Sequence, residues 1–350
     1  MLAPQIDIDE SFRPPRWLSN PHLQTVLPSL PARRRWIEPA ARAVLEASRE
    51  LLLDCGDGVR LQALHARPRV AKTPLVGEGR ATEGAAEGAA EGRTAVLVHG
   101  WEGSADSMYV LSLAQQLFER GFEVVRLNLR DHGPTHHLNK ELFHSCRLPE
   151  VVGALRQLQA LVGGKPLHLA GFSLGGNFML RAAAQARDSG LTIARVVAIS
   201  PVLDPAATLD AMERSCGPYH GYFVRKWTQS LGLKQAAWPG IYDFAELRRA
   251  ANLRRMTAEL VGRFTEFASL EDYLQGYAIV GSRLAPLAVP ATIIAAQDDP
   301  IIPARDLVRL APVRTLRVIL TRRGGHCGFV RRLFSWTWAE RRAAEELDSN

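Results

Sequence analysis

The feature that most constrains the fold is a glycine-flanked serine between an apolar run and a helix-forming run. The run from Leu167 to Ala170 is apolar, and residues Leu174 to Ala186 are rich in helix formers. These two patterns predict a strand, a sharp turn and a helix, with Ser173 at the turn.

The sequence around this turn is specific. It reads Gly171-Phe172-Ser173-Leu174-Gly175-Gly176, a G-x-S-x-G pattern in the strand-to-helix context of a nucleophile elbow. Glycines two positions before and two after the serine remove side chains that would collide in so tight a turn, and they allow strained backbone angles at the serine. A glycine-rich turn with a serine N-cap is the alternative, so the surrounding sequence has to decide between them.

Strand-like and helix-like segments alternate on both sides of the turn. The apolar runs are continuous, which is typical of a mostly parallel sheet covered by helices on both faces, an α/β fold. After a long gap the alternation resumes and ends in a predicted terminal helix over Gly328 to Leu347. The predicted strands besides the one before Ser173 are Thr94 to Val98, Glu123 to Leu129, Arg195 to Ser200, Ala291 to Ala296 and Thr315 to Leu320.

The other segments divide the chain into an arm, a core and an insertion. We expect the proline-rich residues 1–48 to form an extended arm across the domain. Residues 49–203 and 287–350 form the predicted core, within which the Gly, Ala and Glu repeats of 75–93 predict a flexible surface insertion. Residues 204–286 have helical patterns and no strong strand. They far exceed the crossover of about a dozen residues that parallel strands need, which predicts a helical cap.

Composition narrows the functional classes. No apolar run approaches the roughly 20 residues that span a bilayer, and a cytoplasmic location is expected. The net charge of +7 comes from 43 basic against 36 acidic residues, and no nucleic-acid motif accompanies the local arginine clusters, so we expect no nucleic-acid partner. Peripheral contact with an anionic membrane surface stays open, and so does the oligomeric state. The histidines of residues 130–144 lack a metal-ligand spacing, so no metal is expected.

Three further features fall at the carboxyl ends of predicted strands, where open parallel sheets collect catalytic groups. Together with Ser173 they give the chain order Ser, Asp, His, which is that of α/β-hydrolases. The three sequences are His99-Gly100-Trp101-Glu102-Gly103-Ser104, Gln297-Asp298-Asp299-Pro300 and Arg323-Gly324-Gly325-His326-Cys327-Gly328-Phe329.

With the segment Asn20-Pro21-His22-Leu23-Gln24-Thr25, these motifs make the sequence resemble the YheT-type α/β-hydrolases over nearly its whole length. The resemblance implies a serine hydrolase that uses no cofactor and cleaves carboxylic esters of small molecules or lipids. Some eukaryotic members of that family act on phospholipids or form medium-chain ethyl esters. Two alternatives remain: acyl transfer to an alcohol through the same intermediate, and a non-catalytic α/β-hydrolase scaffold.

The chemistry of such a hydrolase gives each residue a role. Ser173 would attack the acyl carbonyl, and His326 would take its proton and later activate water. The backbone N–H groups of Leu174 and Trp101 are the predicted oxyanion donors.

Two adjacent carboxylates, Asp298 and Asp299, are candidates for the acid that orients the histidine. Asp299 is favoured because it stands three residues after Ala296 and four before Pro303, a common spacing in α/β-hydrolases. Pro300 also holds Asp299 in an extended or turn geometry. Asp298 is the alternative, because the doubled aspartate itself belongs to the YheT-like pattern.

Overall fold

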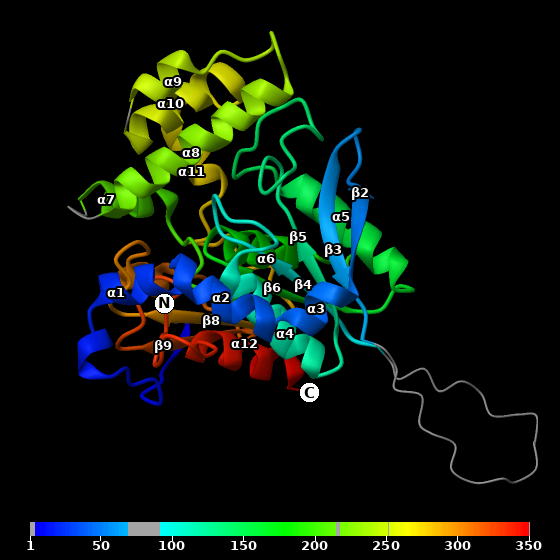
Figure 1. The fold of residues 1–350 in the computed structure, drawn as a ribbon, viewed down its shortest axis with the longest axis vertical. Helices are drawn as coiled ribbons and strands as arrows, with labels where there is room; N and C mark the ends of the chain where they lie inside the picture. Colours follow the sequence, from blue (N-terminus) through cyan, green and yellow to red (C-terminus); the bar gives the residue numbers. More distant parts are fainter. Residues whose placement is uncertain (1–3, 69–91, 215–217, 251, 350) are drawn as a thin grey trace, which may run out of the picture.

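A computed structural model of the protein describes residues 4–68, 92–214, 218–250 and 252–349. The described strands form one nine-stranded sheet in the order β1-β9-β8-β7-β6-β4-β5-β3-β2, with helices on both faces (Figure 1). The first seven strands of this order, from β1 at one edge to β5, run parallel to one another. At the other edge, β3 is antiparallel to β5 and β2 is antiparallel to β3. The predicted α/β fold with a mostly parallel sheet is confirmed. The insertion predicted at 75–93 lies almost entirely outside the described residues.

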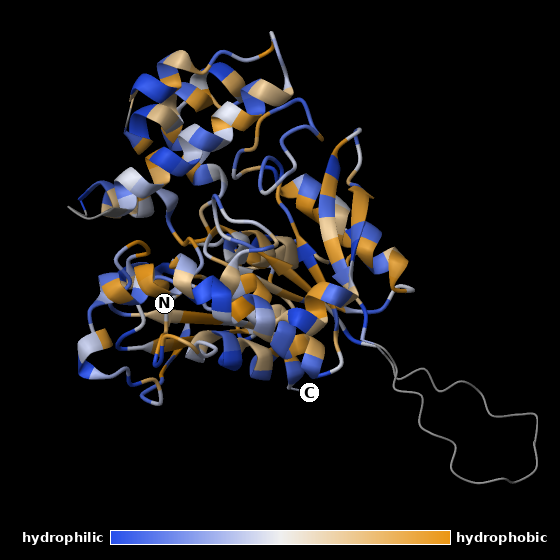
Figure 2. Cartoon of the chain, viewed as in Figure 1, coloured by the Kyte–Doolittle hydropathy of each residue, from blue (hydrophilic) through white to orange (hydrophobic). Residues whose placement is uncertain are grey.

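The six predicted runs match strands of the structure closely, whereas the strand at residues 5–8 was not predicted. The strands are β1 (Gln5–Ile8), β2 (Ser48–Asp54), β3 (Arg60–Ala66), β4 (Thr94–Val98), β5 (Glu123–Leu127), β6 (Leu167–Phe172), β7 (Ile193–Ile199), β8 (Ala291–Ala296) and β9 (Leu316–Thr321). Every residue of β4 and β8 is buried, and the central strands are mainly hydrophobic in Figure 2. Burial on both faces explains why these strands are continuously apolar.

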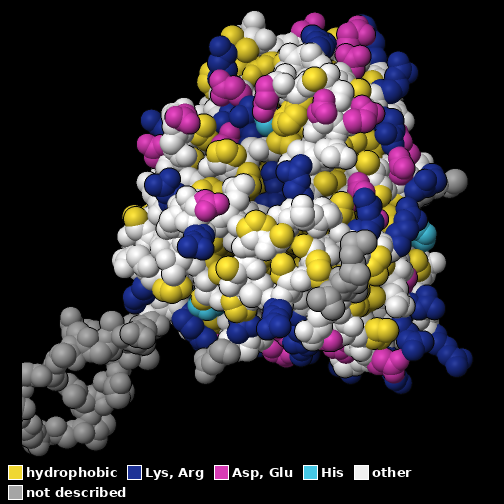
Figure 3. Space-filling model, turned by 180° about the vertical axis from the view of Figure 1, so that it is seen from behind, with side chains coloured by type: hydrophobic (Ala, Val, Ile, Leu, Met, Phe, Trp, Pro, Cys, Tyr) yellow, Lys and Arg dark blue, Asp and Glu magenta, His cyan; other side chains and the backbone are white. Residues whose placement is uncertain are grey.

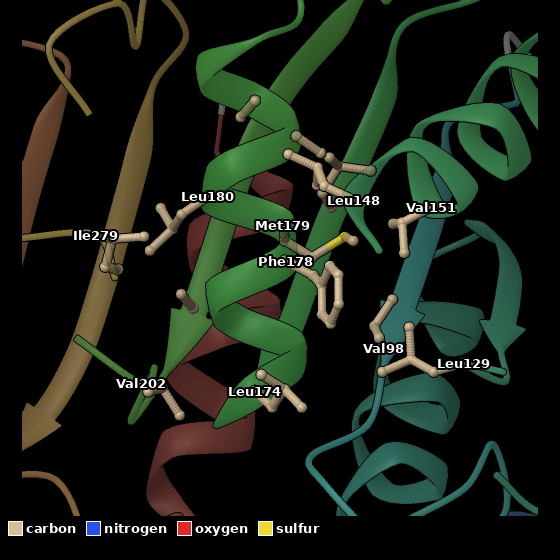
Figure 4. Close-up of a cluster of buried hydrophobic side chains, with 14 of the residues drawn as sticks. Val98, Leu129, Leu148, Val151, Leu174, Phe178, Met179, Leu180, Val202 and Ile279 are labelled. Carbon is tan, nitrogen blue, oxygen red and sulfur yellow. The ribbon is translucent and has the colours of Figure 1, made fainter. Parts of the chain in front are cut away.

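Each face of the sheet carries its own layer of helices. Helices α4 (Met108–Glu119) and α12 (Trp338–Asp348) pack on one face. Helices α5 (Leu148–Leu161) and α6 (Leu174–Ala184) pack on the other. Figure 4 shows Phe178 and Leu180 of α6 projecting into this second core. The helix that follows Ser173 is therefore fixed along its length by apolar packing.

The N-terminal arm differs from the predicted extended segment. It contains helices α1 (Pro21–Val26), α2 (Pro31–Ala40) and α3 (Arg42–Ala47), together with the short 3-10 helices η1 (Arg16–Leu18) and η2 (Leu27–Ser29). Two prolines, Pro21 and Pro31, stand at the first position of a helix, where proline's fixed φ and missing N–H are tolerated. Strand β1 pairs with β9, so the arm begins as an edge of the sheet.

The C-terminal helix is shorter than the predicted one. Residues 328–336 are irregular, and α12 begins at Trp338 behind a capping box of Thr337 and Glu340. Phe329 has a φ of 49° and cannot continue a helix. Residues 304–309 form the 3-10 helix η3 (Ala304–Arg309).

The described part of 204–286 contains five helices and no strand: α7 (Pro205–Arg214), α8 (Pro218–Ala237), α9 (Ala245–Ala250), α10 (Leu253–Phe264) and α11 (Leu270–Gly276). They stand above the sheet in Figure 1. Lys234 of α8 is buried, and its Nζ donates to Asp131 Oδ1 at 2.8 Å and to the carbonyl of Asn139 at 2.6 Å. This buried ion pair joins α8 to the loop after β5. We call residues 204–286 the cap; a role in substrate selection is still a prediction.

The surface carries both signs of charge. On the side of the molecule shown in Figure 3, Lys and Arg side chains lie among Asp and Glu side chains over the upper, cap-bearing part. Within the described residues, no helix has the length and apolar character needed to cross a membrane.

Candidate active site

Ser173 occupies a strained turn between β6 and α6. Its backbone has φ 50° and ψ −116°, a conformation that costs energy and that the packed strand and helix must hold. A Cβ on Gly171 would lie 2.3 Å from the carbonyl of Gly175, and one on Gly175 would lie 2.4 Å from the carbonyl oxygens of Val98 and His99. The glycines on either side of the serine are thus a steric requirement of the turn.

Three loops bring a serine, a histidine and an aspartate together at the carboxyl ends of the strands. His326, in the loop after β9, has its Nε2 at 3.0 Å from Ser173 Oγ. Its Nδ1 lies 3.0 Å from Oδ2 of Asp299, in the loop after β8. The side chain of His326 is 10% exposed and that of Asp299 is 3% exposed. The hydroxyl, imidazole and carboxylate form one hydrogen-bonded chain that is largely shielded from water.

Asp298 faces away from the imidazole. Its Oδ1 accepts the N–H of Gly325 at 3.0 Å, while Asp299 Oδ1 accepts the N–H groups of Ile301 and Ile302 at 2.8 and 2.9 Å. Burial raises the pKa of Asp298. In the structure, the carboxylate of Asp299, the favoured of the two candidates, therefore hydrogen-bonds His326. The carboxylate of Asp298 hydrogen-bonds the backbone of the histidine loop.

The charge state of His326 follows from this arrangement. Burial disfavours the imidazolium, but the neighbouring Cys327 thiol and Asp299 carboxylate together outweigh it and raise the pKa of His326 well above the ordinary value of 6.5. The paired carboxylate also fixes the tautomer, because Nδ1 donates to Asp299 and Nε2 is left to accept from Ser173.

The loop after β4 lies beside the serine. His99 is fully buried; its Nδ1 lies 2.7 Å from the carbonyl oxygen of Gly100, and its Nε2 accepts the N–H of Leu129 at 3.2 Å. Burial lowers the pKa of His99 to about 4, so it is a neutral support for the loop. Within the described residues, the backbone N–H groups of Trp101 and Leu174 have no hydrogen-bond partner. The two predicted oxyanion donors are thus not used in hydrogen bonds within the described part of the protein.

Two of the histidines of residues 130–144 form hydrogen bonds within the protein. His132 Nδ1 lies 2.7 Å from the carbonyl oxygen of Arg130, and His136 Nε2 lies 2.9 Å from Ser230 Oγ. Burial lowers the pKa of His136 to about 4 and that of His144 to about 3. In the part of the chain that the structure describes, no group of three or more His, Cys, Asp or Glu residues is arranged to hold a metal ion.

A pocket of about 720 Å³ opens beside Ser173 and His326. Its walls come from the N-terminal arm, the Trp101 loop and the cap, and they are mainly apolar. The indole of Trp101 stacks on Phe223 of α8 at 5.3 Å and meets Trp227 edge-on at 5.3 Å. Further lining side chains are Leu209, Met212, Leu260 and Tyr273. The hydrogen-bonded chain therefore faces a hydrophobic chamber, as expected of a small-molecule site.

The fold and this geometry agree with a comparison against known families. A family model described as the alpha/beta hydrolase fold matches residues 95–332, a range that contains Ser173, Asp299 and His326. The chain belongs to the α/β-hydrolase family.

This α/β-hydrolase is 26% identical over 340 residues to the Escherichia coli (strain K12) protein named "Putative esterase YheT", covering 94% of the chain and 89% of that protein. The YheT-like resemblance expected from the motifs is confirmed. Among solved structures, an esterase of Pyrococcus furiosus, Pf2001, has a TM-score of 0.51 at 14% identity over 86% of this chain and 91% of its own. A serine hydrolase of Cycloclasticus zankles has a TM-score of 0.50 at 13% identity over 85% and 95% of the two chains. Both share the fold.

Sequence reasoning missed three residues that contact the histidine loop. Ser200 Oγ accepts the N–H of Cys327 at 3.2 Å, and Thr25 Oγ1 accepts that of His326 at 2.9 Å. Gln24 bonds the backbone of Val330. The last two belong to the motif Asn20-Pro21-His22-Leu23-Gln24-Thr25, which indicated the family but gave no sign of which loop it contacts.

Proposed function

We propose that this α/β-hydrolase is a serine esterase that cleaves carboxylic esters through an acyl-enzyme on Ser173. The observation that carries the proposal is the hydrogen-bonded chain from Asp299 through His326 to Ser173, with both links at 3.0 Å, at the wall of an apolar pocket. The similarity to a protein named as an esterase supports the same class of reaction.

The proposed reaction uses each group of the chain in turn. Ser173 Oγ bonds to the ester carbonyl carbon as His326 Nε2 takes the hydroxyl proton, while Asp299 stabilises the imidazolium. The backbone N–H groups of Leu174 and Trp101 donate to the developing oxyanion. The imidazolium then protonates the departing alkoxide, and the acyl group stays on Ser173. Water, deprotonated by His326, attacks the acyl carbon; the bond from that carbon to Ser173 Oγ then breaks as the imidazolium returns its proton to Oγ, and the carboxylic acid is released.

The pocket points to esters with an apolar acyl group. A chamber of about 720 Å³ lined by aromatic and aliphatic side chains has room for more than a short acyl group. Burial of acyl methylenes contributes roughly 0.8 kcal/mol each, so binding strengthens with chain length until the chamber is filled. The cap supplies much of this wall, and we propose that it selects the acyl chain.

The proposal is tested with a series of p-nitrophenyl esters from acetate to palmitate. We expect Phe223→Ser to lower kcat/KM roughly tenfold for medium and long esters and to leave the acetate nearly unchanged, because Phe223 lines the pocket. Phe264→Ser is the matched control, since Phe264 is a half-buried phenylalanine of the cap that packs on Tyr242 and Phe244 instead. A loss of the same size for every ester would contradict acyl selection by the cap, and a wild-type protein inactive on the whole series would contradict the esterase.

The pH dependence follows from the raised pKa of His326. Only the neutral imidazole can accept the Ser173 proton, and its pKa lies well above 6.5. We therefore expect kcat/KM to rise with pH with a midpoint above 6.5, and the residual activity of Asp299→Asn to have its midpoint at lower pH. A wild-type midpoint at or below 6.5 would contradict this account of the imidazole.

A further inference from the structure

The loop that carries His326 is held by side chains from separate parts of the chain. Three consecutive N–H groups donate outward: Gly325 to Asp298 Oδ1 at 3.0 Å, His326 to Thr25 Oγ1 at 2.9 Å and Cys327 to Ser200 Oγ at 3.2 Å. Asp298 and Ser200 follow neighbouring strands of the sheet. Thr25 comes from helix α1 of the N-terminal arm, outside the residues that the family model matches.

Helix α1 is itself locked to this loop. Gln24, which is 0% exposed, donates from Nε2 to the carbonyls of Leu18 at 2.8 Å and Val330 at 2.9 Å, and its Oε1 accepts the N–H of Val330 at 2.7 Å. Thr25 Oγ1 donates to the carbonyl of Pro21 at 2.8 Å, which directs its lone pairs toward His326. The arm thus contacts the loop on both sides of the imidazole-bearing residue.

The contact is close enough to exclude side chains from the loop. A Cβ on Gly328 would lie 2.1 Å from the carbonyl of Gln24, and one on Gly325 would lie 2.5 Å from that of Pro21. Gly325 has a φ of 58°, Cys327 of 55° and Phe329 of 49°. Non-glycine residues adopt such angles only where neighbours hold them. Backbone packing of Gly325 and Gly328 against α1 contributes to that restraint here.

We propose that α1 positions the imidazole of His326, with the Thr25 hydroxyl as the positioning group. The inference rests on the proposed esterase activity and extends it to a part of the chain that lies outside the matched family model. Thr25 acts through His326 and does not act on the ester. Without the Thr25 hydroxyl, the N–H of His326 loses its acceptor. The loop then loses a contact that fixes the position of the imidazole relative to Ser173. As a result, His326 Nε2 lies less often at the distance and angle from Ser173 Oγ that proton transfer requires.

The test compares a variant that loses the Thr25 hydroxyl with one that keeps it. Thr25→Val keeps the shape of the side chain and removes the acceptor, while Thr25→Ser keeps the hydroxyl. Thr265→Val is the matched control in the cap, because Thr265 Oγ1 also donates to a carbonyl one turn back, that of Val261 at 2.8 Å, and accepts a nearby N–H, that of Phe267 at 3.4 Å. Each protein is assayed with p-nitrophenyl butyrate for kcat and KM, and its melting temperature is measured by circular dichroism.

Thr25 also lines the pocket, but valine keeps its shape there, so we expect Thr25→Val to lower kcat roughly 10- to 100-fold through the geometry of proton transfer and to leave KM within about twofold of wild type. The rate of labelling by a fluorophosphonate should fall in parallel, and Thr25→Ser should recover most of both rates. Thr265→Val should leave kcat unchanged even where its melting temperature falls as much as that of Thr25→Val.

Three results would overturn the inference: a wild-type kcat in Thr25→Val, an equal loss of kcat in Thr265→Val, or no recovery in Thr25→Ser while the protein stays folded at the assay temperature. Failure of the esterase itself would look different. It would leave Ser173→Ala as active as wild type, whereas failure of the positioning role alone leaves Ser173→Ala inactive and Thr25→Val normal.

Discussion

Ser173→Ala is expected to lower kcat for p-nitrophenyl esters by roughly 10⁴-fold or more. The variant removes Ser173 Oγ, the atom that bonds to the acyl carbon. His326 then has no hydroxyl to deprotonate, and no oxyanion forms for the backbone N–H groups to stabilise. The melting temperature should change little, since the hydroxyl's interaction is with His326 Nε2 and the elbow backbone is kept.

Ser189→Ala is the matched control for this loss. Ser189 lies just beyond the C-terminal end of α6, and its Oγ donates to the carbonyl of Gln185 at 2.7 Å. We expect its kcat and KM to equal those of wild type. Ester hydrolysis by Ser173→Ala at more than about one hundredth of the wild-type rate would contradict the mechanism, because residual catalysis by an intact site without its nucleophile is far smaller.

Asp299→Asn is expected to lower kcat by up to about 10⁴-fold, by analogy with the serine proteases, since the amide neither stabilises the imidazolium nor enforces the tautomer that leaves Nε2 free to accept. Asp298→Asn is the matched control one residue away. Its side-chain oxygen can still accept the N–H of Gly325, so we expect kcat within about tenfold of wild type. Kinetics on a short p-nitrophenyl ester measure both.

The reverse order of the two losses would assign the acid to Asp298 and would mean that the loop rearranges when substrate binds. Near-normal activity in both variants would remove the acid from this loop altogether. Either result would leave the role of Ser173 untouched, because the nucleophile is tested separately.

The strand, turn and helix around Ser173 could be predicted from the sequence because the determinants are local. Glycines at 171 and 175, an apolar strand and a helix-forming segment all lie within one short stretch, and the steric reason for them is visible in the clashes that a Cβ would make. The motifs that follow β4, β8 and β9 could also be placed, because the carboxyl ends of parallel strands meet at one edge of the sheet.

The choice between Asp298 and Asp299 depended on the turn geometry, which sequence spacing describes only indirectly. Adjacent side chains point to opposite sides of an extended backbone. The turn is set by Asp299 itself, whose Oδ1 accepts the N–H groups of Ile301 and Ile302 and leaves Oδ2 for the imidazole. Spacing to Ala296 and Pro303 favoured the same residue without revealing this reason.

The arm and the C-terminal helix were harder to predict because tertiary contacts decide them. The proline content of residues 1–48 suggested an extended chain, yet Pro21 and Pro31 begin helices. Helical propensity after Gly328 is overridden by the bonds between Val330 and Gln24, which are 306 residues apart in the sequence. The contact of Thr25 with His326 also joins residues that are distant in the sequence, and no local sequence pattern predicts it.

The central claim is that Ser173 is the residue that carries the acyl group, and covalent labelling tests it most directly. Wild-type protein is treated with a fluorophosphonate, digested and sequenced by mass spectrometry, beside a sample protected with an excess of ester substrate. We predict one phosphonylated residue, Ser173, with labelling slowed by the ester and matched by the loss of esterase activity. Label on another residue such as Cys327, which lines the same pocket, or full activity in protein labelled at Ser173, would contradict the account.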